Sequence, residues 1–415
     1  MKRRPKVSVY ILLVFLFVWA ACDTKSNVDP VYKNYFIKYY GEDGNQEGKD
    51  ILVNNDGTLV ILGTSTTITG SKKMYLAKTD VEGEIIWERK LGSSSDEVAV
   101  DIEPILIGPD IGNFAVLSNV TKSVGDSLAI RLTIISPAGD SLKSTLLNQL
   151  KSQEAKSITP LSDGGYFITG KTIDTDPLNV GNLSLTIPDV EDMLLIRLQN
   201  DFLPTQLDRI GGSSIGSGIK IFEGPSIFYY AGDSDEINLF QSPDIGGYES
   251  NFTLRVIEPL NASGTPTGYA GTATNTEELT AIAKSPFGNY LAVGTQTLAG
   301  GDKKIFASIV NSNFSAGTED AIEDNVEGVA VVASVGVDFL VVGNKINPGG
   351  RDIWLAKVGT TLSVQFSATF GGSNNDDTAS AVAELPNGDI VILGTMELVN
   401  QNKIALIKLR SNGQF

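Results

Sequence analysis

Residues 47–92 read EGKDILVNNDGTLVILGTSTTITGSKKMYLAKTDVEGEIIWERKLG. Short apolar runs alternate here with turns that contain Gly, a pattern typical of antiparallel strands joined by tight hairpins. The stretch predicts four strands, at residues 49–54, 59–62, 73–79 and 84–90, with turns at 55–57 and 80–83. Variants of this unit recur along the chain, so the fold is predicted from the repeat and not from any single segment.

The clearest marker of the repeat is an apolar strand that ends in Gly. Such strands are typical of sheets covered on both faces, and the Gly indicates unusual backbone angles or the close approach of another backbone. The seven copies are spaced roughly 50–60 residues apart, as propeller blades are. Six copies end at Gly63, Gly170, Gly232, Gly294, Gly343 and Gly394, and the second copy has Ser118 at the Gly position.

Each marker strand is followed by two further strands, except near the C-terminus, where the chain stops soon after LIKLR at 406–410. The missing outermost strand has an equivalent at the other end, YFIKYY at 35–40. We therefore predict an all-β fold, a seven-bladed β-propeller of four-stranded antiparallel blades, closed by an N-terminal strand that completes the last blade. Residues 35–415 would form this single domain.

Two segments carry a resemblance to a known family. They are DIWLAKVGTTLSVQFSATFGG at 352–372 and GGSNNDDTASAVAELPNGDIVILGT at 371–395, with echoes in GSSSDE at 92–97 and GGSS at 211–214. In these segments the chain resembles the bacterial seven-bladed propeller repeats known as SBBP, and similar lipoprotein repeats. The resemblance implies architecture and supplies no fixed catalytic residue.

Composition excludes several classes of function. The chain has 32 Lys and Arg against 49 Asp and Glu, a formal net charge of −17, so it repels nucleic acid and admits cations or cationic partners. It contains no His and a single Cys, Cys22. These absences exclude Ser-His-Asp and Cys-His catalysis, zinc bound by His, and disulfides within the chain.

The N-terminus predicts export. MKRRPK and then an apolar run of about 15 residues precede Ala20, Ala21 and Cys22, and this arrangement resembles a bacterial lipoprotein signal. Residues 1–21 would be the signal peptide, Cys22 the lipidated residue and 22–34 a polar tether. The predicted location is the bacterial cell envelope, with the outer membrane as the expected membrane and the folded part outside the cytoplasm. An ordinary cleaved signal or an uncleaved anchor is the alternative.

Acidic residues recur where each inner strand begins. We expect most to accept backbone N–H bonds in tight inter-blade loops. The alternative is an acidic rim that attracts cations such as Ca²⁺, with Asp376 and Asp377 as the metal candidates and no other cofactor expected. The recurring acids are Glu47, Asp96, Glu97, Glu154, Glu277, Glu278, Glu327, Asp376 and Asp377.

Two long insertions, at 171–191 and 233–250, follow marker strands of the third and fourth blades. Strand direction places both on the same face as the recurring acids, and insertions collect on functional faces of repeat scaffolds. This face is the candidate recognition surface, for a cationic or hydroxyl-rich partner; tolerated surface loops are the alternative. Its candidate residues are Asp174, Asp176, Asp189, Asp233, Asp235, Glu236, Phe240, Asp244 and Tyr248.

The sequence favours a lipid-anchored module that binds or scaffolds an unknown protein or glycan partner. In this interpretation the protein is not an enzyme, contacts the membrane through its lipid alone and does not bind nucleic acid. The alternative is a carboxylate-dependent glycan-active enzyme, a hydrolase or lyase, which the lack of His does not exclude. Such an enzyme needs two carboxyl groups in one pocket, one with a raised pKa.

Overall fold

The computed structural model describes residues 34–122, 127–173, 191–210, 216–234, 251–257, 265–272, 275–372, 374–399 and 401–415. These residues form 28 strands, β1 to β28. No helix among the described residues is both long and apolar enough to span a membrane.

The strands group into seven four-stranded antiparallel sheets, here called blades 1 to 7 in chain order. Blade 1 contains β2 (Asn45–Val53), β3 (Leu59–Thr66), β4 (Lys72–Thr79) and β5 (Ile85–Leu91). Blade 2 contains β6 (Glu97–Pro104), β7 (Phe114–Thr121), β8 (Leu128–Ile135) and β9 (Ser141–Leu147). Blade 3 contains β10 (Ser152–Pro160), β11 (Tyr166–Ile173), β12 (Glu191–Leu198) and β13 (Pro204–Ile210).

The remaining blades follow the same order. Blade 4 contains β14 (Gly216–Glu223), β15 (Phe228–Ser234), β16 (Asn251–Ile257) and β17 (Thr265–Ala270). Blade 5 contains β18 (Thr276–Lys284), β19 (Tyr290–Thr297), β20 (Lys303–Val310) and β21 (Ala316–Asp324). Blade 6 contains β22 (Val326–Ala333), β23 (Phe339–Asn347), β24 (Gly350–Val358) and β25 (Val364–Phe370). Blade 7 contains β26 (Thr378–Glu384), β27 (Ile390–Leu398), β28 (Gln401–Leu409) and β1 (Phe36–Tyr40).

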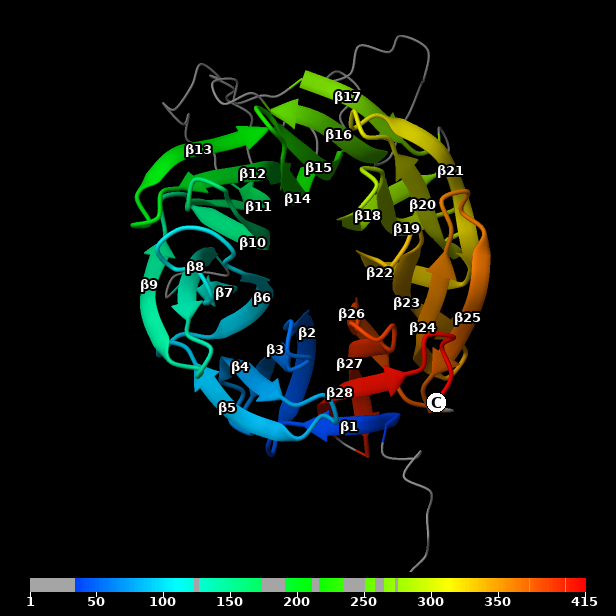
Figure 1. The fold of residues 1–415 in the computed structure, drawn as a ribbon, viewed down its shortest axis with the longest axis horizontal. Coiled ribbons are helices and arrows are strands. Elements are labelled where there is room, and N and C mark those ends of the chain that lie inside the picture. The colour runs from blue at the N-terminus through cyan, green and yellow to red at the C-terminus, as the bar shows by residue number, and fades with distance from the viewer. Residues whose placement is uncertain are drawn as a thin grey trace, which may run out of the picture.

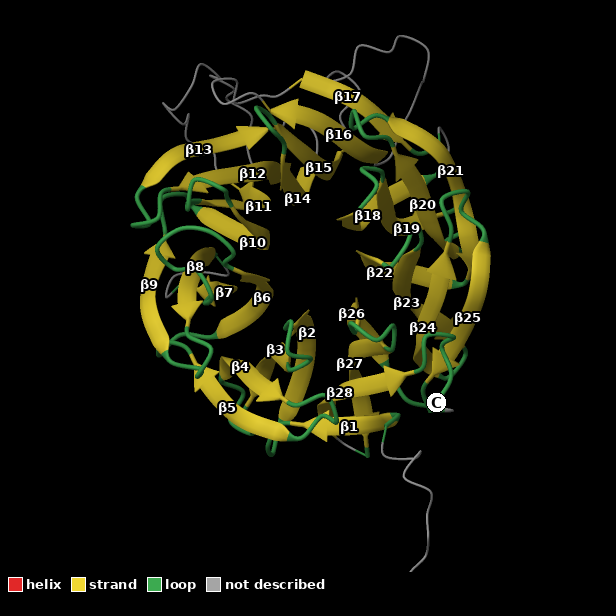
Figure 2. Cartoon of the chain, in the orientation of Figure 1, coloured by secondary structure: helices red, strands yellow, loops and turns green. Residues whose placement is uncertain are grey.

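The blades stand in a ring around a central axis (Figure 1). The first strand of every blade lies innermost and the last strand lies on the rim, and Figure 2 shows strands joined by loops all round the ring. This arrangement confirms the predicted all-β propeller of four-stranded antiparallel blades. Because consecutive strands of a blade are antiparallel, the loop entering a blade and the loop between its second and third strands lie on one face of the ring. We call this the entry face.

The two ends of the folded chain share blade 7. β1 pairs antiparallel with β28, with Phe36 opposite Lys408 and Tyr40 opposite Ile404. The Tyr40 side chain is buried, and its hydroxyl donates a hydrogen bond to the backbone oxygen of Gly83, 2.7 Å away, in the turn between β4 and β5. The N-terminal strand therefore lies between β28 and a turn of blade 1.

The core lies between neighbouring blades. The marker strands β3, β7, β11, β19, β23 and β27 are buried along nearly their whole length, as their apolar sequences predict. One cluster joins blades 1 and 2 through Val60, Leu62, Ile102 and Val116. Another joins blades 6 and 7. Apolar side chains on the facing surfaces of adjacent blades therefore hold these blades together.

The marker Gly has a packing role. None of the six marker glycines has a left-handed φ, so unusual backbone angles do not explain them. A Cβ on Gly63 would lie 2.5 Å from the backbone oxygen of Glu47 in the inner strand, and one on Gly394 would lie 2.6 Å from that of Thr378. Each inner strand bulges at this level, which brings its carbonyl against the Gly. Close backbone approach is thus the correct interpretation of the two that the sequence offered.

Candidate active site

A cavity of about 750 Å³ occupies the centre of the ring and is lined by the inner strands of all blades. This volume lies in the range of small-molecule sites, roughly 300–1,000 Å³. Each inner strand has a bulge, at which one residue does not pair with the second strand of the blade. The next residue along the strand pairs again, and its side chain borders the cavity. From blade 1 to blade 7 these residues are Asp50, Asp101, Ser157, Lys220, Ala281, Ala330 and Ala381.

This ring of equivalent positions divides the cavity into two halves. Blades 1 to 4 contribute polar and charged side chains, and blades 5 to 7 each contribute Ala. Val329, Val331 and Val332 extend the apolar half, which we call the alanine wall. The cavity thus offers charged groups on one side and small aliphatic groups on the other, the arrangement of an amphipathic ligand site.

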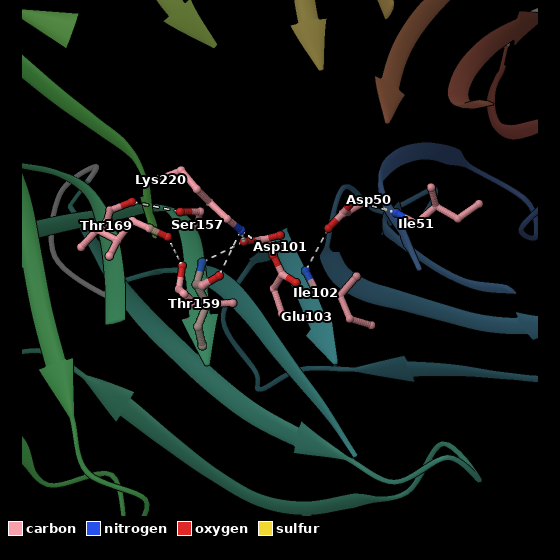
Figure 3. A network of polar contacts seen from close by, with 11 residues as sticks. Asp50, Ile51, Asp101, Ile102, Glu103, Ser157, Thr159, Thr169 and Lys220 are labelled. Atoms are coloured by element: carbon pink, nitrogen blue, oxygen red, sulfur yellow. Dashed lines mark hydrogen bonds and ion pairs between the residues drawn. The ribbon is translucent and has the colours of Figure 1, made fainter. Parts of the chain in front are cut away.

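The charged half is organised around Lys220 (Figure 3). The Lys220 ammonium lies 2.5 Å from Glu103 Oε1 and 3.6 Å from Asp101 Oδ2, and it donates a hydrogen bond to the Ile158 carbonyl at 3.2 Å. Burial by itself would lower the pKa of Lys220, but Asp101 and Glu103 outweigh it and raise that pKa. Lys220 is therefore a fixed cation.

Two aspartates bridge successive blades in this half (Figure 3). Asp50 Oδ2 accepts a hydrogen bond from the backbone N–H of Ile102 at 3.1 Å, and Asp101 Oδ2 accepts one from Ile158 at 2.8 Å. Burial raises the pKa of Asp50 well above its usual range, and the charge and hydrogen bond of Asp101 raise it further. These conditions favour a protonated Asp50 beside Asp101.

A second set of equivalent positions follows the marker Gly and connects the blades. In five blades its side-chain oxygen accepts the backbone N–H of the next blade's inner strand, at 2.8–3.1 Å. These residues are Thr64, Asn119, Thr295, Asn344 and Thr395. Blades 3 and 4 depart from the pattern and carry Lys171 and Asp233, both of which line the cavity. These two blades therefore place charged side chains in the cavity at a position where the other five form a hydrogen bond between blades.

Lys171 belongs to a chain of ion pairs at the cavity mouth. Its ammonium lies 2.9 Å from Glu191 and 3.6 Å from Glu154, and Glu154 also pairs with Lys156 at 2.7 Å. Burial would raise the pKa of Glu154, but the two lysines outweigh it, and the pKa of Glu154 lies below its ordinary value. Glu154 is therefore a stable anion.

Asp233 has the opposite environment. Its Oδ1 atom is buried and accepts no hydrogen bond from any described residue. Burial and then the negative charge of Glu278 raise the pKa of Asp233 to about 7, partly opposed by a backbone hydrogen bond at Asp233 and by the charges of Lys156 and Lys171. Glu278 also lines the cavity. Asp233 is thus a carboxyl group with a pKa near neutral pH, in the same cavity as a second carboxyl group whose charge acts on it. Two carboxyl groups with different pKa values in one cavity are typical of acid–base catalysis.

Of the residues predicted for the recognition surface, the structure brings Asp233 to the cavity. The described ends of the first insertion, Lys171 and Glu191, line the same cavity. The other candidates, Asp174, Asp176, Asp189, Asp235, Glu236, Phe240, Asp244 and Tyr248, lie outside the described residues.

Several of the recurring acids have the structural role that the sequence favoured. Glu97 accepts the Ser93 N–H at 3.2 Å, and Glu277 accepts that of Thr272 at 3.1 Å. Asp377 accepts the N–H groups of Gly372 and Glu397 at 2.8 and 2.9 Å. The expected backbone bonding is confirmed at these positions.

The two metal candidates, Asp376 and Asp377, form contacts within the protein. Asp376 forms a two-pronged ion pair with the Arg351 guanidinium, at 2.7 and 2.5 Å, and Asp377 serves the loop bonds just described. Within the described part of the chain, no three Asp, Glu, Cys or His side chains gather to hold a metal ion. The geometry at Asp376 and Asp377 is that of loop stabilisation.

Sequence reasoning missed the deeper cavity residues, Lys49, Asp50, Asp101, Glu103 and Lys220. It considered the acids at the start of each inner strand, whereas these residues lie further along the strand, past or at the bulge. A comparison of inner strands that allowed for the bulge would have shown charged residues in blades 1, 2 and 4 where blades 5 to 7 have Ala.

Sequence comparison provides no family for this chain: no protein-family model matches it, and no curated protein matches it. Solved structures do resemble it in fold. An ulvan lyase, described as a new family of polysaccharide lyase, is 9% identical with a TM-score of 0.57, over 91% of this chain and 97% of that one. The plexin A4 extracellular region is 10% identical with a TM-score of 0.53, over 88% of this chain and 50% of that one. A Penicillium chrysogenum α-L-arabinanase is 11% identical with a TM-score of 0.46, over 76% and 94%.

These comparisons correct one expectation. The sequence favoured a protein that is not an enzyme, yet the similar structures include a polysaccharide lyase, which is a glycan-active enzyme. At this identity the likeness shows the propeller fold alone. The expectation was wrong because it rested on a repeat motif that indicates architecture and supplies no catalytic residue, and a propeller scaffold by itself does not exclude enzyme activity.

Proposed function

We propose that the protein is a carboxylate-dependent glycan-active enzyme whose active site is the central cavity. The observation that carries the proposal is the Asp233–Glu278 pair, in which burial and a neighbouring charge raise the pKa of one carboxyl group to about 7. Enzymes that cleave glycosidic bonds need one carboxyl group that keeps a proton and a second that does not.

The proposed roles follow from this difference. Asp233 donates its proton to the glycosidic oxygen as the bond breaks. Glu278 is the second carboxylate: in a hydrolase it activates water or attacks the anomeric carbon, and in a lyase it removes a proton from the sugar ring. The backbone hydrogen bond at Asp233, and then the charges of Lys156 and Lys171, lower the pKa of Asp233 and so limit the rise caused by burial and Glu278.

Two further observations support a glycan as the substrate. The cavity has about the volume of a few sugar rings and pairs a charged half with the alanine wall, and sugars have a polar rim and apolar faces. The ulvan lyase with the similar fold has also been solved bound to the repeat -[GlcA(1-4)Rha3S]-, with a TM-score of 0.55 and 8% identity. A propeller of this shape therefore accommodates glycan chemistry.

The test is turnover by the full-length protein on a panel of neutral, uronate-containing and sulfated polysaccharides between pH 5 and 8. New reducing ends are expected on at least one polymer, and ultraviolet absorbance from an unsaturated sugar separates a lyase from a hydrolase. Binding without turnover at any pH, or neither binding nor turnover, contradicts the proposal.

We also propose that the protein is lipid-anchored through Cys22, with the cavity mouth facing away from the membrane. The support is the course of β1: Phe36, its first residue, packs beside Gly83 in the β4–β5 turn, on the face opposite the entry face. A tether that precedes Phe36 would then meet the ring on that far face, while Asp233 and Glu278 lie at the entry face.

Replacement of Cys22 by Ser is expected to prevent lipidation and to release the protein from membranes. The measurement is fractionation, together with mass analysis of the mature N-terminus. A Cys22→Ser protein that stays membrane-bound with unchanged processing contradicts the anchor. Thr24→Ala, two residues further along the tether, is the control and should behave as wild type.

A further inference from the structure

Lys49 differs from the other lysines of the cavity. It occupies the bulge of β2 and lines the cavity, but no described residue forms a hydrogen bond or ion pair with its ammonium group. The other cavity lysines are paired: Lys220 with Glu103, Lys171 with Glu191 and Lys156 with Glu154. Among these four cavity lysines, Lys49 is therefore the one that a ligand can bind without breaking an ion pair.

The surroundings of Lys49 disfavour its free charged state. Its side chain is open to the cavity, but the ring of protein around it lowers its pKa by partial desolvation. The charge of Lys156 lowers that pKa further, and Asp50, Asp101 and Glu154 only partly offset both effects. A partly desolvated cation without a partner is unfavourable, and an anionic group bound next to it removes that cost. The site is thus prepared for an anion on a ligand.

The opposite side of the cavity limits what kind of molecule carries that anion. The alanine wall offers Ala281, Ala330 and Ala381 with valine side chains beside them, which suits the apolar face of a sugar ring and leaves room for it. A bare inorganic anion would use Lys49 and leave this wall without a contact. The two halves together fit a ring that carries a negative charge on one edge.

We propose that Lys49 binds the carboxylate or sulfate of an anionic glycan whose ring lies against the alanine wall. This inference deepens the proposed function by naming the substrate class, and it rests on that function only for the turnover of the bound glycan. Carboxylate and sulfate share the chemistry that Lys49 recognises, namely oxygen acceptors with a full negative charge.

The experiment measures dissociation constants of the full-length protein for two matched pairs of polymers. Polygalacturonate and its methyl ester test the carboxylate, and dextran sulfate and dextran test the sulfate. Wild type is expected to bind one anionic polymer at least about tenfold more tightly than its neutral partner, the effect of one charge-assisted contact.

Lys49→Met is expected to lose that preference and to keep the affinity for the neutral polymer. Lys304→Met is the matched control, because Lys304 pairs with Asp324 at 2.9 Å away from the cavity and its removal changes the net charge equally. Wild type without a preference, or a Lys49→Met protein that retains it, overturns the inference. So does an equal loss in both variants, which would indicate attraction by overall charge.

Two readouts separate this inference from the proposed function. Binding is also measured with Asp233→Asn, which cannot donate the proton but keeps Lys49. If wild type prefers the anionic polymer but does not cleave it, the inference about Lys49 holds and the proposed enzyme function is contradicted. If wild type cleaves a polymer without preferring the anionic one, the enzyme function holds and the inference about Lys49 is contradicted. Thermal melts accompany every variant, and Lys49→Gln replaces Lys49→Met if the latter does not fold.

Discussion

Asp233→Asn is expected to reduce turnover by about 10²–10⁴-fold, the usual contribution of a positioned general acid. Asn preserves the shape of the side chain but has no proton of suitable acidity to give to the leaving oxygen. The measurement is the rate of bond cleavage on whichever polymer wild type degrades, with binding measured in parallel. A variant that retains more than about a third of the wild-type rate contradicts the role of Asp233.

The pH profile gives an independent check on the same pair. Because Asp233 must be protonated, activity should fall as the pH rises through about 7, the pKa given to it by burial and Glu278. Glu278→Gln removes the negative charge and so lowers the pKa of Asp233. The fall in any residual activity with rising pH should then occur at a lower pH than in wild type. Glu47, the equivalent residue of blade 1, does not line the cavity, and Glu47→Gln should leave this fall at the wild-type pH.

Stability separates a catalytic Asp233 from a structural one. Its pKa is raised in the folded protein, so the folded state binds more protons than the unfolded state between about pH 4 and pH 7. Folding stability is therefore lost as the pH rises through this window, and Asn at 233 removes the loss. The melting temperature of Asp233→Asn at pH 8 should equal or exceed that of wild type. Thr295→Val, which removes the acceptor for the Gly328 N–H, should instead lower it.

The fold was predictable from the sequence because its signals are local and repeated. Apolar runs ending in Gly, turns such as 55–57 and a near-constant spacing specify strands, hairpins and blades without any long-range information. The shared face of the two insertions stays a prediction from strand direction, because residues 174–190 and 235–250 lie outside the described residues. Strand ends were less accurate: the first inner strand begins at Asn45 and not at residue 49, because pairing with β3 continues beyond the bulge.

The site was less predictable because a bulge changes which side chains share a face. Beyond the bulge in β2 the alternation is displaced by one residue, so an uninterrupted period of two groups Asp50 with the buried Gln46 and Gly48, whereas Asp50 borders the cavity. The pKa of Asp233 was also beyond the sequence, since it arises from burial and from Glu278 on the next blade. What the sequence did contain is the exception at Lys171 and Asp233 among positions that are otherwise Thr or Asn.

Deletion of residues 30–41 is expected to lower the melting temperature by about 10 °C and to promote self-association. The deletion removes β1, and with it the backbone pairing to β28, the buried Tyr40 ring and the ion pair between Lys38 and Glu84 at 2.6 Å. Loss of these contacts costs roughly 5 kcal/mol of the free energy of unfolding, chiefly from the buried apolar surface and the strand's hydrogen bonds.

The same deletion leaves β28 as an open edge. Its central residues Ile404 to Ile407 are buried and apolar, so the exposed backbone next to them is a template for pairing with a second chain. Calorimetry gives the melt, and light scattering gives the mass at several concentrations. Deletion of residues 23–29, which precede the strand, is the control and should leave both unchanged. An unchanged melt and a monomeric mass after removal of 30–41 would show that the pairing of β1 with β28 adds nothing to the stability of the ring.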